Sequence, residues 1–339
     1  MKNLIKSFLI VVILLVNSCG EGITEPEAGR RDYVWEVDEI NPGYESLYLG
    51  RIWGSSPNDV WAVGSSSWSA TSIWHYDGIK WETDSIPRAV DPTAIWGLSK
   101  NEVWLGNYDY NNNIWRYNGS KWSLFGSYIL DGYDILCINY FDGTSSNNIY
   151  GVGFVELYGK SKWKAIIMHY NGTNWRFVDI PESKASFESV AIVPGSDILV
   201  VGGTIYDPKG FIAKVYCWDG KELKEIFSSL GGWTFVVRLG NEIFISHSSQ
   251  IYKYSDKRLT LWMDNRGKGI NGNIICGRSR NDFFIGGDEG IYHYNGKEFY
   301  NIYNTELVVR RGYIFEKDVF FIGLDYVNGK NYIIHGKLK

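Results

Sequence analysis

A short recurring segment constrains the fold of this chain more than any other feature of its sequence. In each copy, an acidic residue or an asparagine is followed by aromatic and aliphatic residues and then by Gly or Ser. The seven copies, at intervals of 36 to 49 residues, are NDVWAVG (58–64), NEVWLG (101–106), NNIYGVG (147–153), SDILVVG (196–202), NEIFIS (241–246), NDFFIGG (281–287) and KDVFFIG (317–323). Periods of this size are typical of propellers and solenoids.

A second segment follows each copy and carries a hairpin signal. It reads IWHYDGIKW (73–81), IWRYNGSKW (114–122), IMHYNGTNW (167–175), VYCWDGKEL (215–223), IYKYSDKRL (251–259) and IYHYNGKEF (291–299). Asp-Gly or Asn-Gly between aromatic-rich runs favours a tight turn, because glycine adopts positive φ without steric cost. With the apolar run that precedes several copies, such as TAIWGLS (93–99), each repeat predicts four short strands, a to d. We find no runs of helical periodicity that would indicate a helical solenoid.

The repeats therefore predict an all-β fold, a seven-bladed β-propeller of four-stranded antiparallel blades over residues 33–339. The seventh repeat, YIIHGKLK (332–339), ends without its strand d. The segment Val34–Ile40 matches Lys80–Ile86, which contains strand d of the first repeat. We expect this N-terminal strand to complete the last blade, because closure removes an exposed sheet edge.

The start of the chain predicts export. Residues 1–18 combine basic residues with a short apolar run, as secretory signal peptides do. Val16-Asn17-Ser18-Cys19 resembles a bacterial lipobox, which implies lipidation of Cys19 and anchoring at the outer membrane or cell surface. The alternatives are an ordinary signal peptide with an incidental cysteine, or a transmembrane anchor, for which the apolar run is short. Residues 19–32 are polar and predict a flexible tether after the lipidated cysteine.

Composition narrows the classes of partner. The chain has a net charge of −4 with both signs scattered, so no nucleic-acid partner is expected. Cys137, Cys217 and Cys276 show no zinc-binding spacing, and we expect them inside strands. No cofactor and no metal ligand set is predicted. We expect a monomer that meets the membrane through its lipid anchor only.

The segments WGSSPNDVWAVG (53–64) and WHYDGIKW (74–81) resemble a repeat of bacterial secreted proteins and lipoproteins. Those proteins are regarded as β-propellers of mostly unknown function, some labelled glucosyltransferase. More distantly, the chain looks like the photosystem II assembly propellers and the sialidase-like propellers. The intact sialidase Asp-box is absent, so the resemblance carries no sialidase chemistry to this chain.

Most repeated residues are expected to be structural. Trp61, Trp104 and Tyr150 lie among the apolar residues of strand b and are expected to pack between blades. The carboxylates that precede strand b are expected to accept local backbone hydrogen bonds. These carboxylates belong to Asp59, Glu102 and Asp282.

The loops that vary between repeats are the candidate binding site. In a propeller, the b–c and d–a loops open on the same face, and here they are rich in aromatic residues. Aromatic rings stack on sugars, so we predict that this face binds a glycan or an envelope protein. The predicted ligand-binding residues are Trp68, Tyr108, Tyr110, Tyr158, Trp163, Tyr206 and Trp233, with Tyr128, Arg266, Asp325 and Tyr326 nearby. The alternative is that these rings pack against neighbouring loops.

Enzyme signals are weak, and we assign no catalytic residue. No nucleophile, zinc or phosphate-loop motif is present. A glycan-active hydrolase or lyase remains an alternative, because loop-face carboxylates offer acidic pairs of the kind glycosidases need. These carboxylates are Asp109, Glu156, Asp207, Asp288 and Asp325. A further alternative is a structural assembly factor of the envelope.

Overall fold

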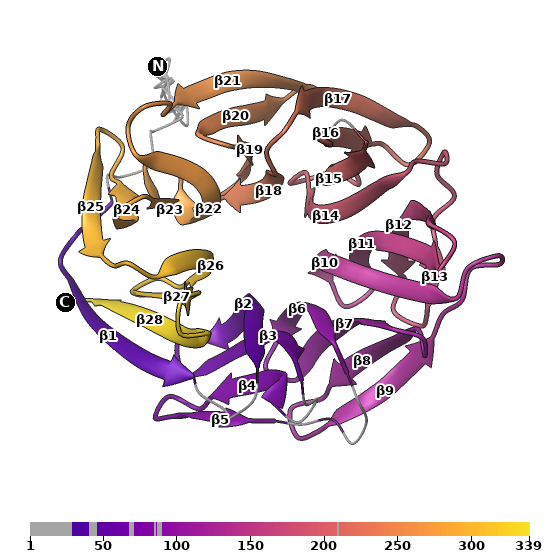
Figure 1. Cartoon of the computed structure of the whole chain (residues 1–339), viewed down its shortest axis with the longest axis horizontal. Helices are drawn as coiled ribbons and strands as arrows, with labels where there is room; N and C mark the ends of the chain where they lie inside the picture. The colour runs from indigo at the N-terminus through magenta and orange to yellow at the C-terminus, as the bar shows by residue number, and fades with distance from the viewer. Residues whose placement is uncertain (1–28, 41–45, 68–70, 85, 87–89, 209) are drawn as a thin grey trace, which may run out of the picture.

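The computed structural model describes residues 29–40, 46–67, 71–84, 86, 90–208 and 210–339. Throughout these residues the regular structure is β, in 28 strands with antiparallel pairing. The strands form five four-stranded sheets and one eight-stranded sheet, arranged in a ring (Figure 1). The predicted signal peptide and Cys19 lie outside the described residues. No helix with the length and apolarity needed to cross a membrane occurs in the described part of the chain.

Four of the four-stranded sheets follow chain order, with each strand paired to the next. The first comprises β2 (Leu47–Ser56), β3 (Asp59–Ser66), β4 (Ile73–Tyr76) and β5 (Trp81–Thr83). Another comprises β14 (Ala185–Ile192), β15 (Leu199–Asp207), β16 (Gly210–Trp218) and β17 (Leu223–Leu230). The next two are β18 (Thr234–Leu239), β19 (Glu242–His247), β20 (Gln250–Ser255) and β21 (Arg258–Asp264), then β22 (Ile270–Ser279), β23 (Asp282–Gly287), β24 (Gly290–Tyr294) and β25 (Phe299–Asn304).

The eight-stranded sheet contains two consecutive groups of four strands. The first group is β6 (Pro92–Ser99), β7 (Glu102–Asp109), β8 (Asn113–Tyr117) and β9 (Trp122–Ser127). The second group is β10 (Ile135–Ser145), β11 (Asn148–Leu157), β12 (Lys162–Tyr170) and β13 (Trp175–Phe177). Only two residue pairs join the groups, Leu136 with Asp109 and Cys137 with Tyr108. The repeats predicted seven separate four-stranded sheets, and the structure has five four-stranded sheets and this eight-stranded one.

The N-terminal strand lies in the last sheet, as predicted from its match to the first repeat. This sheet has the order β1 (Tyr33–Ile40), β28 (Lys330–Leu338), β27 (Asp318–Asp325) and β26 (Val308–Ile314). The antiparallel register of β1 with β28 runs from the pair Tyr33 and Leu338 to the pair Ile40 and Asn331. The first and last strands, β1 and β28, therefore lie side by side in one sheet (Figure 1).

Residues assigned to the end of the tether also contact the body. The Gly29 amide donates to the carbonyl oxygen of Asn281 at 3.0 Å, and Arg31 forms an ion pair with Glu298 at 3.1 Å. The described chain is therefore held to the ring from residue 29 onward.

The innermost strands form the inner wall of the ring. They contact one another in the order β2, β6, β10, β14, β18, β22 and β26, and β26 contacts β2 again. Each is followed by the repeat segment as the next strand outward. The glycine near the end of that segment is required by close packing, since a Cβ at Gly64 would lie 2.0 Å from the Tyr48 carbonyl oxygen. At Gly153 the corresponding distance, to the Cys137 carbonyl oxygen, is 1.9 Å.

The predicted Asp-Gly and Asn-Gly turns join the third and fourth strands of their sheets. In the first sheet, Asp77 Oδ1 accepts hydrogen bonds from the backbone amides of Ile79 and Lys80 at 2.8 and 2.9 Å, and Gly78 has a φ of 94°. The same arrangement recurs at Asn118, Asn171, Asp219 and Asn295. This local chemistry explains why the hairpin signal could be read from the sequence.

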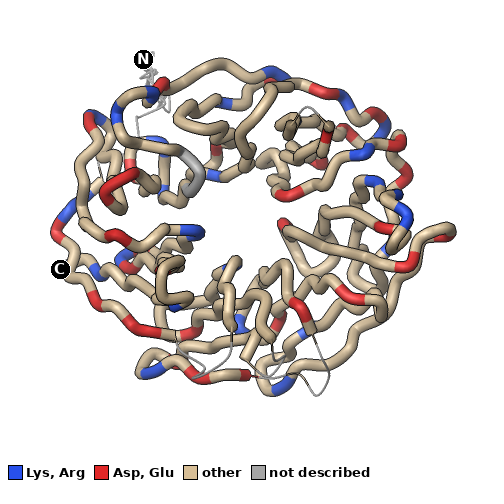
Figure 2. Tube along the Cα trace, in the orientation of Figure 1, with Lys and Arg blue, Asp and Glu red and all other residues tan. Residues whose placement is uncertain are grey.

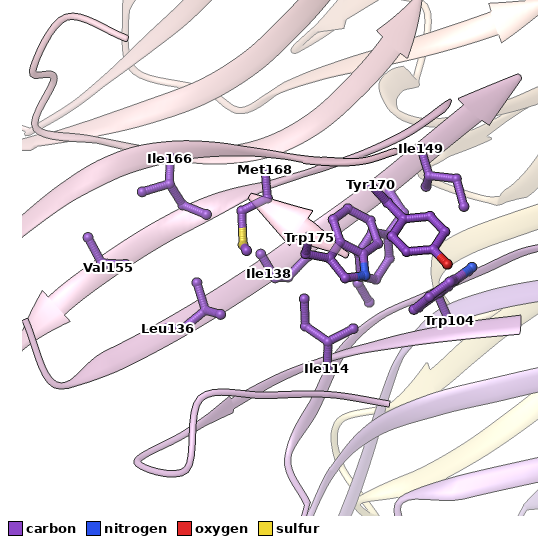
Figure 3. Close-up of a cluster of buried hydrophobic side chains, with 12 residues drawn as sticks. Trp104, Ile114, Leu136, Ile138, Ile149, Val155, Ile166, Met168, Tyr170 and Trp175 are labelled. Atoms are coloured by element: carbon purple, nitrogen blue, oxygen red, sulfur yellow. The ribbon is translucent and has the colours of Figure 1, made fainter. Parts of the chain in front are cut away.

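Large apolar side chains fill the space between neighbouring groups of strands. Trp61 and Trp104 are fully buried, as predicted for the repeat tryptophans. Figure 3 shows Trp104 of β7 facing Trp175 and Tyr170 of the next group, and its ring centroid lies 5.4 Å from that of Trp175. The predicted burial of the cysteines is also confirmed, and all three are free thiols, at Cys137, Cys217 and Cys276.

Candidate functional site

Bulges in the innermost strands direct polar side chains toward the centre of the ring. A register shift lies beside the residue that pairs with the repeat glycine in five of these strands. Each shift leaves one residue without a ladder partner, and these residues are Gly50, Thr93, Asn139, Glu188 and Arg310. Bulges bend a strand and re-aim side chains. Three of these residues, Asn139, Glu188 and Arg310, line the cavity described next.

A cavity of about 540 Å³ lies between these innermost strands and residues of the b–c and d–a connections. Its polar lining comes from Arg51, Asn139, Ser186, Glu188, Arg310 and Arg311. Its apolar lining comes from Phe154, Tyr206, Trp233, Phe235, Val308 and Val309. Tyr206 ends a second strand and Trp233 precedes a first strand, so residues from b–c and d–a connections line one cavity, as expected for loops sharing a face.

Exposed aromatic rings continue from this cavity along the same face. Phe211 lies 5.3 Å from Tyr206 and 5.5 Å from Trp233 between ring centroids. Trp163 lies 6.4 Å from Tyr206 and lines an adjoining cavity of about 260 Å³ together with Phe154. We call Trp163, Tyr206, Phe211 and Trp233 the aromatic strip. Three of them, Tyr206, Phe211 and Trp233, are 38% to 45% exposed, so their rings are accessible to a ligand.

The structure separates Tyr110 and Tyr158 from the aromatic strip. Tyr110 and Tyr158 are each 59% exposed and contact one another at 5.3 Å, but neither lines the cavities described above. Tyr108 lies closer to the strip, because its hydroxyl donates to Glu156 at 3.1 Å and its ring centroid lies 6.1 Å from that of Phe154, and both partners line the 260 Å³ cavity. Trp68 lies outside the described residues.

The prediction that these residues all lie in loops is wrong for Tyr108, Trp163 and Tyr206. All three lie in strands, because the second and third strands of these sheets extend further than the repeat motif. Tyr206, for example, pairs with Phe211 near the end of the β15–β16 hairpin. The strand ladder therefore fixes the backbone of most of the aromatic strip.

Two further predicted neighbours have structural roles. Tyr128 packs against the buried cluster around Trp104. Arg266 forms an ion pair with Asp264 at 2.5 Å. Tyr326 is on the loop face, where its hydroxyl accepts a hydrogen bond from Arg310 at 2.6 Å.

The sequence analysis missed the charged groups of the cavity. Arg51, Glu188, Arg310 and Arg311 all belong to innermost strands, which were treated only as apolar runs. A signal was present, because a strand expected to be buried carries unpaired charges only rarely. VVRRGYI (308–314) is the clearest example.

Burial perturbs the ionisation of these groups. Burial raises the pKa of the Glu188 carboxyl to about 7, although Arg51 and Arg311 oppose the shift. Burial, followed by the charge of Arg51, lowers the pKa of the Arg311 guanidinium to about 9. Burial also lowers the pKa of Arg51. The cavity therefore combines guanidinium groups with a carboxyl whose pKa lies well above its ordinary value.

Two of the loop-face carboxylates considered for catalysis, Asp109 and Asp325, are engaged in local bonds, whereas Glu156 lines the 260 Å³ cavity beside Trp163. Asp109 Oδ1 accepts from the amides of Asn111 and Asn112 at 2.8 and 2.9 Å. Asp325 Oδ1 accepts from the amides of Val327 and Asn328 at 2.9 and 3.0 Å. Such bonds hold turns. Within the residues that the structure describes, no group of three or more His, Cys, Asp or Glu is arranged to hold a metal ion.

The carboxylates before the second strands are structural, but their partners differ from those predicted. His75 Nε2 lies 2.7 Å from Asp59 Oδ1, and His293 Nε2 lies 2.8 Å from Asp282 Oδ1. The His75 ring also stacks on Trp61 at 4.0 Å between centroids. Asp59 and Asp282 therefore bond a histidine on the next strand outward, whereas Glu102 accepts a hydrogen bond from Ser146 Oγ at 2.7 Å.

Comparisons with solved structures support the fold. YCF48 bound to D1 peptide has a TM-score of 0.62 at 11% identity, covering 92% of this chain and 98% of that one. YCF48 from Cyanidioschyzon merolae has a TM-score of 0.58 at 14% identity, covering 89% and 98%. The extracellular domain of a proposed one-component system from B. thetaiotaomicron has a TM-score of 0.56 at 14% identity, covering 88% and 40%. No protein-family model and no curated protein matches the sequence.

The ring of antiparallel four-stranded units and these similarities define the class of the protein. It is a β-propeller. Identities of this size establish the fold alone, so the function is argued below from the site.

Proposed function

We propose that this chain is a lipid-anchored, non-enzymatic binding propeller that takes a glycan on its b–c/d–a loop face. The observation that carries the proposal is the aromatic strip, which continues directly from a polar cavity. Aromatic faces stack on the apolar faces of sugar rings, and amide or charged groups bond the hydroxyls. Asn139, Ser186 and Glu188 supply such groups inside the cavity.

We also infer that the ring has seven blades, with the eight-stranded sheet counted as two. Two residue pairs link its halves, whereas each half has a full four-stranded ladder of its own. The two halves also pack face to face through Trp104 and Trp175, with rings inclined at 86°. Residues of one flat sheet do not pack in this way. The bulged strand β10 is long enough to reach β7 while still serving as an innermost strand.

The anchoring part of the proposal rests on the N-terminal sequence. Val16-Asn17-Ser18-Cys19 resembles a lipobox, and the repeats resemble those of bacterial secreted propellers and lipoproteins. An acylated Cys19 would hold the propeller at an outer membrane or cell surface, since two or more acyl chains anchor a protein stably. The propeller acts there as a monomer.

An envelope protein is the second candidate ligand, in a binding or assembly role. The observation that favours it is the similarity to a propeller solved with a bound peptide, YCF48 with D1 peptide. Glycan hydrolysis is less well supported, because glycosidases use two carboxyl groups, whereas Glu188 is the one carboxylate lining the 540 Å³ cavity and Glu156, in the adjoining cavity, is hydrogen-bonded to Tyr108.

A binding experiment with the full chain, purified in detergent, tests the loop-face function. The chain is applied to an array of bacterial and host glycans, and Trp233→Ala and Phe211→Ala are compared with it. Tyr300→Ala is the matched control, since Tyr300 is an exposed aromatic residue on β25, outside the strip. We expect at least a tenfold loss of affinity for the strip variants and none for the control. Unchanged binding in all three variants contradicts the proposed face.

If no glycan binds, the same variants are used to capture proteins from envelope extracts. If Tyr300→Ala retains a protein partner that Trp233→Ala loses, the loop face is the binding surface and its ligand is a protein. A partner retained by every variant refutes the loop face as the binding surface.

A further inference from the structure

Three arginines meet at the wall of the 540 Å³ cavity. Arg51 comes from β2, and Arg310 and Arg311 come from β26, the innermost strands of sheets that adjoin in the ring. Arg310 is the residue that the β26 bulge leaves unpaired, and Arg311 follows it directly. Figure 2 marks this basic part of β26 beside the centre of the ring. A chain of net charge −4 thus concentrates positive charge at one internal position.

These arginines bond neutral acceptors instead of carboxylates. Arg51 donates to the carbonyl oxygen of Asn139 at 3.2 Å and to that of Gly50 at 3.0 Å. Arg311 donates to the carbonyl oxygen of Arg310 at 3.4 Å. Arg310 donates to the hydroxyls of Tyr48 and Tyr326. In the described chain, none of the three guanidinium groups forms an ion pair.

The rest of the cavity offsets only part of this charge. Glu188 is the one lining carboxylate, so a single acidic group faces three guanidinium groups, and its charge interacts with those of Arg51 and Arg311. At the other end of the ring centre the situation differs, because Arg238 is paired with Asp142 at 2.5 Å. The unpaired arginines therefore remain available to an anion from outside, and binding one would offset part of the cost of their burial.

Aromatic groups stand next to the cationic wall. Arg311 lies over the ring of Phe235 at 4.2 Å. Phe235 and Trp233 line the same cavity on the arc of the ring opposite β2 and β26, and Tyr206 joins them from β15. A ligand that spans the cavity thus meets guanidinium groups on one side and the aromatic strip on the other.

We propose that this cavity binds an acidic glycan, with a sugar carboxylate held between Arg51 and Arg311 and the adjoining ring stacked on Trp233. The inference rests on the proposed glycan-binding function and names its ligand class. Guanidinium groups recognise carboxylates with paired, charge-assisted hydrogen bonds. A cavity of about 540 Å³ is within the range of sites that bury a small ligand, and it fits one or a few sugar rings.

The test compares acidic oligosaccharides with neutral versions of the same molecules. The full chain is titrated calorimetrically with trigalacturonate, with a hyaluronan tetrasaccharide and with the methyl ester of each, after an array of acidic glycans has ranked further candidates. We expect an acidic glycan to bind at least tenfold more tightly than its ester. The preference should weaken as salt is raised, because part of it is electrostatic.

Variants separate this inference from the proposed function. Arg311→Gln and Arg51→Gln should each lose about tenfold or more in affinity for the acid and little for the ester. Arg266→Gln is the control, since Arg266 is an exposed d–a loop arginine outside the cavity. Trp233→Ala should lose both ligands. Thermal melting of each variant verifies that it is folded.

Each outcome supports or overturns the acidic-glycan inference. Equal binding of acid and ester, or unchanged selectivity in Arg311→Gln and Arg51→Gln, overturns the acidic-glycan inference and leaves the glycan-binding face intact. Failure of every acidic glycan on the array to bind also overturns it. If the array is blank for neutral glycans as well, the glycan function fails too. Arginine-dependent capture of an acidic protein would show that the site takes a different class of ligand.

Discussion

Replacing Trp35 by alanine tests whether the N-terminal strand contributes to the stability of the ring. Trp35 lies in β1, where its ring is 5.0 Å from that of Tyr303 and 5.5 Å from that of Tyr33. Trp81 occupies the corresponding position in the first sheet, where it stacks on Tyr76 at 5.3 Å. Both tryptophans are partly buried, so Trp81→Ala is a matched reference within a sheet that is continuous in sequence.

The expected magnitude follows from burial. Truncating a fully buried tryptophan costs about 3 to 5 kcal/mol, so a partly buried one should cost about 2 kcal/mol. In a domain of roughly this size, each kcal/mol shifts the Tm by about 2 °C, which gives a shift of about 4 °C. Because β1 pairs with β28 along its whole length, Trp35→Ala should cost as much as Trp81→Ala.

Differential scanning calorimetry on the two variants measures this comparison. Val37→Ala is the negative control, since Val37 lies on the same strand with 45% of its side chain exposed. A Trp35→Ala shift as small as that of Val37→Ala, together with a full shift for Trp81→Ala, would refute closure of the ring by the N-terminal strand. Deleting residues 33–40 should then also leave the Tm unchanged.

Two further predictions concern titration and anchoring. Burial raises the pKa of Glu188 to about 7 from an ordinary value near 4.5, so the folded chain holds a proton there that the unfolded chain releases. The contribution of this carboxyl to the free energy of unfolding is fully present below about pH 4.5 and is lost as the pH rises through 7. Glu188→Gln should therefore stabilise the protein by at most about 3 kcal/mol at pH 8 and hardly at all at pH 4. Urea unfolding at the two pH values measures this difference, and greater stabilisation at pH 4 than at pH 8 would contradict it. Cys19→Ala should abolish acylation and membrane retention, which fractionation and mass spectrometry measure; a variant that still sediments with membranes contradicts the lipobox interpretation.

The fold was largely predictable because its strongest signals are local. The turn at Asp77-Gly78 is specified by a side chain that bonds the next amides and by a glycine with positive φ. Burial of Trp61 follows from its apolar neighbours in the repeat. The pairing of β1 with β28 joins residues far apart in the sequence. It could still be predicted, because Val34–Ile40 matches the segment of the first repeat that contains strand d.

The site was predictable only in part, because it depends on how separate repeats meet. Tyr206 and Trp233 were identified from their loops, and both line the cavity. Phe211 was missed because it begins a strand, and no sequence rule placed it between those two rings. The approach of Arg51 to Arg311 depends on how two adjoining sheets pack. The repeat period predicts that these sheets are neighbours but does not predict which of their side chains come together.

The inner bulges show how one repeated unit can produce a site without repeated chemistry. The strand ladder on either side of each bulge is maintained by backbone pairing, and the repeat glycine opposite it leaves room for the close approach of the two strands. The bulged residue itself takes no part in that ladder, so its side chain is free to differ from one repeat to the next. Thr93, Asn139, Glu188 and Arg310 occupy these positions in four strands. Ligand preference in this propeller should therefore depend on the bulge residues as well as on Arg51, Arg311 and the variable loops, and exchanging Glu188 or Arg310 should change which ligand binds while leaving the ring intact.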